Sequence, residues 1–317
     1  MLAPMGTVGG ARRRALELAL LATAALGAIV GLALLARVQA HASFPGANGR
    51  IAFVRGSGPS ASLEIFTMQA DGSHLRRLTN NAAKDDDPAY SANGKRIAFE
   101  SDRSGHRAIW KMDANGGRQR RLTGNSGDNL DQPAFSPSGG RIAFRDQGGS
   151  GARIDSIRSD GSHLRALTAR STNFDPNYSP NGKRIAFDSQ RDGDPEIFVM
   201  HSDGSREHQL TDNSASDFSP DYSPNGRRIV FDSDRNGVNQ IFVMHSDGTH
   251  ERQLTHSPVD VFNAAYSPNG KRIVFETTAA GGDTEIAVMR SDGTHARRIT
   301  NNSVDDFSSS WQPKRRR

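Results

Sequence analysis

The amino-acid sequence predicts an all-β fold, a six-bladed β-propeller whose blades are four-stranded antiparallel sheets. Three observations support this: a segment of about 44 residues repeats six times, each repeat holds four short strand patterns, and the two chain ends complete one blade together. The 317 residues include 32 glycines and 14 prolines, which suits many short strands and turns rather than a helical bundle.

Three positions define the repeat. The isoleucine of an Arg-Ile-Ala/Val-Phe strand recurs at Ile51, Ile97, Ile142, Ile185, Ile229 and Ile273. The glycine of a turn resembling Ser-Asp-Gly-Ser/Thr recurs at Gly72, Gly116, Gly161, Gly204, Gly248 and Gly293. The aliphatic residue of an Arg/Gln-Leu/Ile-Thr segment recurs at Leu78, Leu122, Leu167, Leu210, Leu254 and Ile299. A period of this length with several strands per repeat is typical of propeller blades.

The fifth repeat shows the four expected strands in order. The first surrounds Tyr222 and ends at a Ser-Pro-Asn-Gly turn, whose last two residues accept the positive φ that a tight hairpin needs. The others are expected over 228–231, 240–244 and 252–255, separated by turns rich in Asp and Gly. The third has the mixed apolar content of a sheet buried on both faces.

The ends of the chain indicate how the ring closes. The first repeat begins at Phe44, essentially at its second strand, so its innermost strand is missing. Near the C-terminus, Trp311 takes the place that an aromatic residue has in the other repeats, at Tyr90, Phe135, Tyr178, Tyr222 and Tyr266. The C-terminal strand is therefore predicted to complete the first blade and leave no free sheet edge.

Several segments resemble a known family. The stretches Tyr-Ser-Pro-Asn-Gly-Lys-Arg-Ile-Ala-Phe-Asp-Ser (178–189), Glu-Ile-Phe-Val-Met (196–200) and Gln-Leu-Thr (209–211) are similar to the TolB-like, WD40-like propeller repeat. The resemblance covers 44–313 and implies the propeller fold. Such blades serve in a translocation protein, in peptidase gating domains and in some sugar lyases, so the fold does not fix the function. TolB itself has an N-terminal α/β domain, for which we expect no counterpart between Ser43 and the first blade.

Three segments are expected along the chain. Residues 1–42 carry three arginines (12–14), an apolar run (15–36) and Ala-His-Ala (40–42), the pattern of a signal peptide; the run of about 20 residues is also long enough for a membrane anchor. The propeller occupies 43–313 and a basic tail 314–317. The basic residues before the apolar run predict an extracytoplasmic propeller, periplasmic, in the cell envelope or secreted.

The charge is unevenly distributed. The isoelectric point near 9.8 depends on the two ends, and without 1–42 and 314–317 the chain has 32 basic and 34 acidic residues. A surface that follows nucleic-acid phosphates needs clustered Lys and Arg, so nucleic acid is not an expected partner. The absence of cysteine excludes disulfides and thiolate metal sites.

Each predicted innermost strand has a carboxylate at its start. The residues are Asp86, Asp131, Asp175, Asp217, Asp260 and Asp306. Six such loops would converge at one mouth of the central channel, where carboxylates could bind a cation, a basic peptide or sugar hydroxyls. The alternative is that these residues cap the turns before the strands.

One turn resembles the start of a calcium loop. Asp232, Asp234 and Asn236 precede a glycine with the spacing D-x-D-x-N-G, but Val243 stands where an EF-hand requires glutamate. A hairpin turn is the favoured interpretation and calcium the alternative; no other cofactor is expected. The histidines that follow several Asp-Gly turns belong to different blades and are expected on the surface.

The sequence lacks the common catalytic signatures. It has no Gly-x-Ser-x-Gly, no His-Glu-x-x-His and no phosphate-binding Gly-x4-Gly-Lys-Ser/Thr. The leading hypothesis is an exported, non-catalytic and monomeric propeller that binds a protein, peptide or envelope glycan at its channel mouth; the resemblance adds a TolB-like envelope complex. The alternatives are a carbohydrate-active enzyme or lyase that uses Asp131, Asp175 and Asp217, and a structural scaffold. Membrane contact is expected only through the N-terminal segment.

Overall fold

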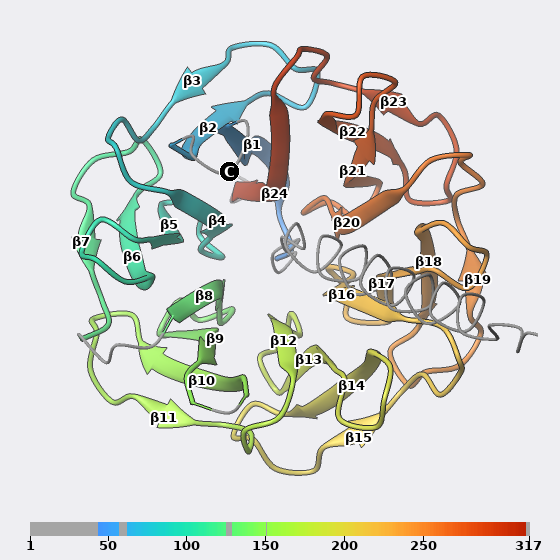
Figure 1. Cartoon of the computed structure of the whole chain (residues 1–317), viewed down its shortest axis with the longest axis horizontal. Helices are drawn as coiled ribbons and strands as arrows, with labels where there is room; N and C mark the ends of the chain where they lie inside the picture. The colour runs from blue at the N-terminus through green and yellow to red at the C-terminus, as the bar shows by residue number, and fades with distance from the viewer. Residues whose placement is uncertain (1–43, 57–61, 125–128, 150, 315–317) are drawn as a thin grey trace, which may run out of the picture. The chain divides into compact units, whose positions relative to one another are not determined.

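The computed structural model describes residues 44–314, except 57–61, 125–128 and 150. Six four-stranded sheets surround a central axis, which confirms the predicted six-bladed propeller (Figure 1). The predicted signal peptide or anchor at 1–42 and the last three arginines of the basic tail lie outside the described residues. Within the described ranges no helix has the length and hydrophobicity needed to cross a bilayer.

The strands follow the predicted repeat, and the outermost strand of every blade is short. They are β1 (Ala47–Gly56), β2 (Glu64–Met68), β3 (Arg76–Arg77), β4 (Asp85–Tyr90), β5 (Arg96–Ser101), β6 (Ala108–Asp113), β7 (Arg120–Arg121), β8 (Asn129–Phe135), β9 (Arg141–Gln147), β10 (Arg153–Arg158), β11 (Arg165–Ala166), β12 (Asn173–Tyr178), β13 (Arg184–Ser189), β14 (Glu196–His201), β15 (His208–Gln209), β16 (Asp217–Tyr222), β17 (Arg228–Ser233), β18 (Gln240–His245), β19 (Arg252–Gln253), β20 (Val261–Tyr266), β21 (Arg272–Thr278), β22 (Thr284–Arg290), β23 (Arg297–Arg298) and β24 (Asp305–Lys314). In the outermost strand β3, for example, both residues are exposed.

Five blades are continuous in sequence and the sixth joins the two ends of the chain. The continuous blades are β4–β7, β8–β11, β12–β15, β16–β19 and β20–β23, and the closing blade has the order β24-β1-β2-β3. In it, Ile51 lies opposite Trp311 and Ala47 opposite Lys314. The predicted closure by the C-terminal strand is therefore confirmed. Every described strand and the buried core belong to 44–314, so this part contains a complete fold by itself.

The core lies between neighbouring blades. The isoleucines that define the repeat are buried in the second strand of each blade, with no exposed surface. Aromatic rings on the second and third strands pack together, as Phe187 and Phe198 do with centroids 5.8 Å apart. Burial on both faces explains why these strands read as continuous apolar runs rather than as alternating patterns.

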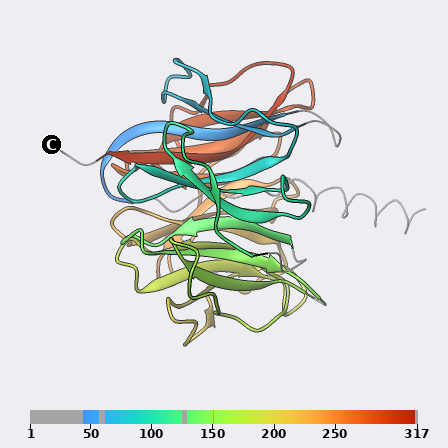
Figure 2. The ribbon, with the colours of Figure 1, turned by 90° about the vertical axis from the view of Figure 1, so that its left-hand side faces the viewer.

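The two ends of the ring differ in their connections. At the end that we call the loop end, a loop leads into each innermost strand and a turn joins the second strand to the third. At the turn end, tight turns join the first strand to the second and the third to the fourth. Figure 2 shows the strands from the side, with β24 finishing at the turn end near the C-terminus. At one of these turns, Gly226 has φ of 69° and its N–H donates to the Ser223 carbonyl over 2.7 Å, as the Asn-Gly pattern predicts.

A threonine extends each short outermost strand. In all six blades the hydroxyl of the threonine in the Leu/Ile-Thr pair accepts a hydrogen bond from a buried isoleucine N–H of the third strand, over 2.8 to 3.1 Å. The acceptors are Thr79, Thr123, Thr168, Thr211, Thr255 and Thr300. The threonine hydroxyl supplies the hydrogen-bond acceptor at the point where the backbone of the outermost strand no longer pairs with the third strand. The repeated threonine is therefore a structural residue.

We expect Thr211→Val to destabilise the propeller by about 1–3 kcal/mol, because it leaves the buried Ile197 N–H without its acceptor. Urea unfolding measures this change. The matched variant Thr211→Ser keeps the hydroxyl and should cost about 1 kcal/mol or less through the lost methyl group. An equal loss in both variants would mean that packing, rather than the hydrogen bond, explains why threonine recurs in every repeat.

Candidate functional site

The innermost strands share a bulge where they line the channel. In β12, Phe174 pairs with Asp188 and Asn177 with Ala186, so two residues lie opposite one on β13. The first of these two has φ between 50° and 56° in every blade; we call it the bulge position. Its residues are Asp87, Gln132, Asp175, Ser219, Asn263 and Ser308. Each is a non-glycine residue with left-handed backbone, a conformation that the surroundings must hold in place.

Side chains at the bulge position connect neighbouring blades. The Gln132 N–H donates to Asp87 Oδ2 over 3.0 Å, which links β8 to β4. The Asp175 N–H donates to Gln132 Oε1 over 3.2 Å, which links β12 to β8. Ser219 Oγ lies 3.1 Å from Asp175 Oδ2 and thereby links β16 to β12. Half of the ring is therefore joined by polar contacts at one level of the channel.

The other half of the ring is joined in the same way. Ser219 Oγ also lies 3.1 Å from Asn263 Oδ1. Glu276 accepts hydrogen bonds from Asn263 Nδ2 over 2.9 Å and from the Ser309 N–H over 3.3 Å, connecting β20 to β24. Ser308 Oγ donates to Asp86 Oδ1 over 2.7 Å and returns to β4. The bulge belt, as we call this set, thus links all six innermost strands.

The Ser219 hydroxyl joins Asp175 and Asn263 in the belt. The Ser219 hydroxyl has one proton but two oxygen neighbours at 3.1 Å, Asp175 Oδ2 and Asn263 Oδ1. Because the Asn263 amide nitrogen already donates to Glu276, its oxygen faces Ser219 as an acceptor. The Ser219 hydroxyl can donate to only one of these oxygens at a time, so its proton is shared between Asp175 and Asn263. Burial, with the nearby charge of Asp188, raises the pKa of Asp175 well above its usual value.

Carboxylates from the second strands support the bulge of the following blade. Asp188 Oδ1 accepts from the Ser219 N–H over 3.3 Å, and Asp232 Oδ2 accepts from the Asn263 N–H over 2.6 Å. Burial raises the pKa of Glu276, which serves the same level of the channel, well above its usual value. In three blades the acidic residue after the Ile-Ala/Val-Phe strand therefore accepts a hydrogen bond from a backbone N–H of the next blade.

The predicted calcium residues have separate partners. Asp232 binds the next blade as described, Asp234 Oδ1 accepts from the Ser216 N–H over 2.8 Å, and Asn236 Nδ2 donates to Gln253 Oε1 over 2.9 Å. Among the described residues no group of three His, Asp or Glu side chains is arranged to hold a metal ion. These contacts are those of a structural turn, and calcium binding stays a prediction.

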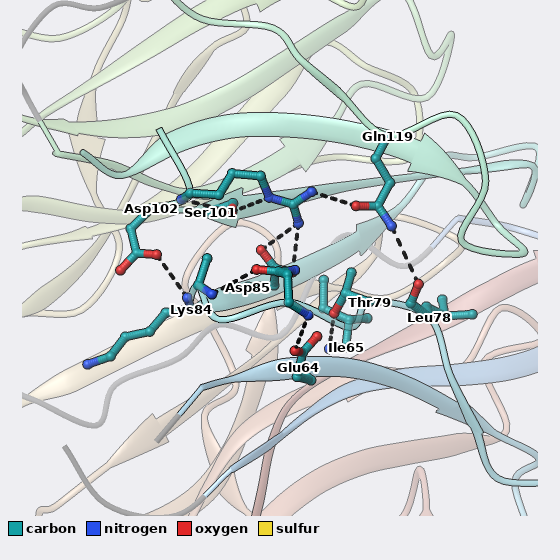
Figure 3. A network of polar contacts seen from close by, with 12 residues as sticks. Glu64, Ile65, Leu78, Thr79, Lys84, Asp85, Ser101, Asp102 and Gln119 are labelled. Atoms are coloured by element: carbon teal, nitrogen blue, oxygen red, sulfur yellow. Dashed lines mark hydrogen bonds and ion pairs between the residues drawn. The ribbon is translucent and has the colours of Figure 1, made fainter. Parts of the chain in front are cut away.

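Three of the predicted mouth residues, Asp131, Asp217 and Asp306, form ion pairs within their own blades. Asp217 lies 3.0 Å from Arg235, and Asp306 lies 2.6 Å from Arg55; both aspartates are fully buried. Asp85 is the equivalent residue of the next blade and pairs with Arg103 over 2.7 Å; Figure 3 shows its surroundings. Arg103 and Arg235 come from the turn between the second and third strands and fasten that turn to the innermost strand, whereas Arg55 lies on β1 directly opposite Asp306.

The same arginines pack on aromatic rings. The guanidinium carbon of Arg235 lies 4.4 Å from the Phe242 ring centroid, and that of Arg103 lies 4.6 Å from the Trp110 centroid. Arg191 repeats the arrangement over Phe198 at 4.5 Å. Buried charge at this position is thus both paired and stacked, which is the condition under which it is tolerated. These carboxylates belong to the fold rather than to an open ligand site.

The six predicted mouth residues do not form one ring. Asp217 and Asp306 lie two residues before the bulge position, Asp86 and Asp131 come one residue later in register, and Asp175 is at the bulge position. Asp260 precedes β20, and its Oδ1 accepts a hydrogen bond from the Asn239 N–H over 2.8 Å. A single carboxylate ring is therefore the wrong geometry, since only Asp86, Asp131 and Asp175 lie at or next to the bulge belt.

A mixed aromatic and charged rim occupies the register position just before the bulge, on the loop-end side. We call it the rim; its residues are Asp86, Asp131, Phe174, Phe218, Phe262 and Phe307. The rings of Phe174, Phe262 and Phe307 are half-buried, whereas Phe218 is buried. The sequence reasoning missed this aromatic half, although the regular spacing of the four phenylalanines was a usable signal.

The charged half of the rim has a surplus of carboxylates. Asp131 is bound by Arg145 over 2.6 and 2.5 Å, and Arg107 lies 3.1 Å from Glu100 and 3.4 Å from Asp131. Burial raises the pKa of Asp86 and, more strongly, those of Asp87 and Glu100. The Arg107 side chain remains 44% exposed. An arriving polar group can therefore meet both a cation and carboxyl groups beside apolar rings.

Comparisons with known proteins agree with this architecture. Residues 37–173 and 168–317 each match the family model described as the TolB beta propeller domain. The structure of TolB from Acinetobacter baumannii is similar with a TM-score of 0.76 and 22% identity, over 84% of this chain and 67% of that one. A putative TolB from Agrobacterium tumefaciens is similar with a TM-score of 0.68 and 21% identity, over 83% and 98%. At these identities the structural likeness shows the fold.

A sequence relative covers a smaller part. An uncharacterized protein of Agrobacterium fabrum is 35% identical over 60 residues, which are 19% of this chain and 20% of that protein. The match thus spans about a fifth of that relative's length, and it adds no information on activity or partners.

We expect Asp175→Asn to increase the free energy of unfolding at neutral pH relative to the parent chain. Because the folded-state pKa is raised, the folded chain holds the proton more tightly, and parental stability falls as pH rises from about 4, the pKa of unfolded Asp, towards the folded value. Asparagine keeps a donor towards Ser219 and never ionises. Urea unfolding between pH 4 and 8 should show a gain that grows with pH.

A matched control substitution at Asp247 should change the free energy of unfolding in the opposite direction. Asp247 is exposed and accepts from Thr249 Oγ1 over 2.7 Å, which lowers its pKa. Asp247→Asn should therefore lose stability at neutral pH, and the loss should disappear on acidification below about pH 4. If Asp175→Asn destabilised the chain equally at every pH, the belt would need the charged carboxylate.

Proposed function

The chain belongs to the TolB beta propeller family, and we propose that it is a binding module that holds a protein or peptide partner at the rim of its loop end. The observation that carries this proposal is the rim itself, where the half-buried Phe174, Phe262 and Phe307 occupy the same register position as Asp86, at the loop end that also holds the exposed Arg107. Aromatic and arginine side chains are the residues on which protein-binding energy most often depends.

The rim is held by a rigid support. Each rim residue directly precedes a bulge-belt residue in the same strand, and the belt joins all six innermost strands. Side chains on connected strands lose little conformational freedom when a partner binds, which favours affinity. The buried aspartates that pair with Arg55, Arg103 and Arg235 take part in this support rather than in contact with a partner.

The composition of the rim favours a peptide with an apolar side chain next to a charged or hydrogen-bonding group. Apolar rings line one side, and Asp86 with Arg107 supplies charges of both signs on the other. An envelope glycan, a lyase reaction and a purely structural role gain no specific support from this arrangement. Place and assembly are part of the proposal: an extracytoplasmic monomer that is exported by the segment 1–42, which anchors the chain in the membrane if it is retained.

The test is capture of a partner from native envelope extract by immobilised residues 43–317, identified by mass spectrometry. The double variant Phe262→Ala/Asp86→Asn removes one ring and one charge from the rim while keeping an acceptor for Ser308. We expect it to weaken binding of the captured partner by at least about tenfold, measured by titration calorimetry with the purified partner.

A matched variant at the turn end controls for the loss of apolar surface away from the rim. Leu75 and Leu164 are exposed by 48% and 60%, and Leu75→Ala/Leu164→Ala removes apolar surface far from the rim. This control should bind like the parent chain. Equal binding by the rim variant, with its fold verified by circular dichroism, would exclude the rim as the binding site.

A further inference from the structure

The two ends of the propeller carry opposite charge. The turn-end segments are 44–50, 69–77, 91–96, 113–121, 136–141, 158–166, 179–184, 201–209, 223–228, 245–253, 267–272, 290–298 and 312–314. Counted along the printed sequence, they contain 23 lysines and arginines and 8 aspartates and glutamates. The excess comes from every blade, because an arginine directly precedes the repeat isoleucine of the second strand in all six blades and the turn before it often ends with Lys or Arg.

The loop end shows the reverse. Its described segments are 55–56, 62–64, 78–87, 100–107, 122–124, 129–131, 145–149, 151–155, 167–175, 188–196, 210–217, 232–239, 254–261, 276–285 and 299–306. Counted in the same way, they contain 24 aspartates and glutamates and 9 lysines and arginines. The nearly neutral total for the propeller therefore conceals a separation of charge along the axis.

The positive charge of the turn end is exposed, whereas much of the negative charge of the loop end is not. Lys183, Arg227 and Lys271 follow the Pro-Asn-Gly turns, their side chains are exposed, and none of them forms a side-chain hydrogen bond or ion pair within the described part of the chain. At the loop end, carboxylates such as Asp217 and Asp306 are buried against arginines. The positive charge of the turn end is therefore less compensated by opposite charges than the negative charge of the loop end is.

We propose that the turn end docks on an anionic membrane surface, with the rim at the opposite end facing away from the lipid. The turns of six blades present their cationic side chains over a broad ring, which suits a surface of many headgroups. Each Lys or Arg near such a surface contributes about 1 kcal/mol, and the attraction decays within a Debye length of about 8–10 Å. This surface is distinct from the rim and does not depend on the rim's partner.

The positions of the chain ends favour a membrane over another polyanion. Gly46 donates its N–H to the Pro268 carbonyl over 3.0 Å, and Ala47 pairs with Lys314, so the described chain both begins and finishes at the turn end. The apolar run 15–36 precedes Phe44 by seven residues, a reach of about 25 Å when extended, and three more arginines follow Lys314. Both the apolar and the basic extension therefore continue from the cationic end.

The test is sedimentation of residues 43–317 with vesicles of phosphatidylglycerol and phosphatidylcholine, or of phosphatidylcholine alone, at low and high salt. We expect binding to the anionic vesicles only, and weaker binding as salt increases. The variant Lys183→Gln/Arg227→Gln/Lys271→Gln should lower the partition coefficient by roughly fivefold for each charge removed, about 100-fold in total.

The control changes the net charge by the same amount at the other end. Ser104, His106 and Ser214 are exposed at the loop end, and Ser104→Glu/His106→Glu/Ser214→Glu also lowers the net charge by three. It should bind vesicles like the parent chain. The proposal is overturned if both variants lose binding equally, if neutral vesicles bind as well as anionic ones, or if the chain binds a soluble polyanion such as a single-stranded oligonucleotide but no vesicle.

Discussion

The structure depends on how the six innermost strands satisfy their backbones where they meet around the channel. Each of these strands is an edge, with no strand partner on its channel side, and unpaired N–H groups there would be costly once buried. In five of the six strands an N–H at the bulge donates to a neighbouring blade, to acceptors such as Asp87, Gln132 and Asp232, whereas in β4 the Asp87 N–H donates to Asp86 of the same strand. The ring is therefore held by contacts between blades as well as by the apolar packing that fills the space between them.

Meeting that constraint with carboxyl groups has an electrostatic cost. Burying ionised carboxylates close together is unfavourable, and two solutions are present. Where an arginine is available, as at Asp217 with Arg235, the charge is kept and paired. At Asp175, burial and the nearby charge of Asp188 raise the pKa well above its usual value, although Arg145 is close enough to oppose the shift. The same residue type is therefore accommodated in two different ways, one blade apart.

The sequence was sufficient for the fold and insufficient for the site. The period between Ile51 and Ile273 and the missing innermost strand before Phe44 predicted six blades and their closure, because both are properties of the whole repeat. The mouth residues needed single-residue accuracy. Asp86 and Asp217 look equivalent as carboxylates near the start of a strand, yet they differ by one position in register, and one position reverses the direction of a side chain. The arginine that pairs with Asp217 comes from a turn 18 residues away, and no sequence pattern next to the aspartate indicates this partner. The net charge of the chain was misleading in a similar way, because summing the charges over the whole chain hides the difference in charge between the turn end and the loop end of the propeller.

Closure by the last strand has a consequence for the order in which the molecule can form. The Arg50 N–H and the Gln312 side chain that accepts from it are separated by 262 positions, so β1 has no inner neighbour until nearly the whole chain has been synthesised. Contacts between such distant segments are slow to form, and an unpaired strand is a place where aggregation begins. A chain that has completed only its five continuous blades therefore still has β1 without its inner partner. In a ring closed in this way, the last strand to be made is the one that covers the edge of the first.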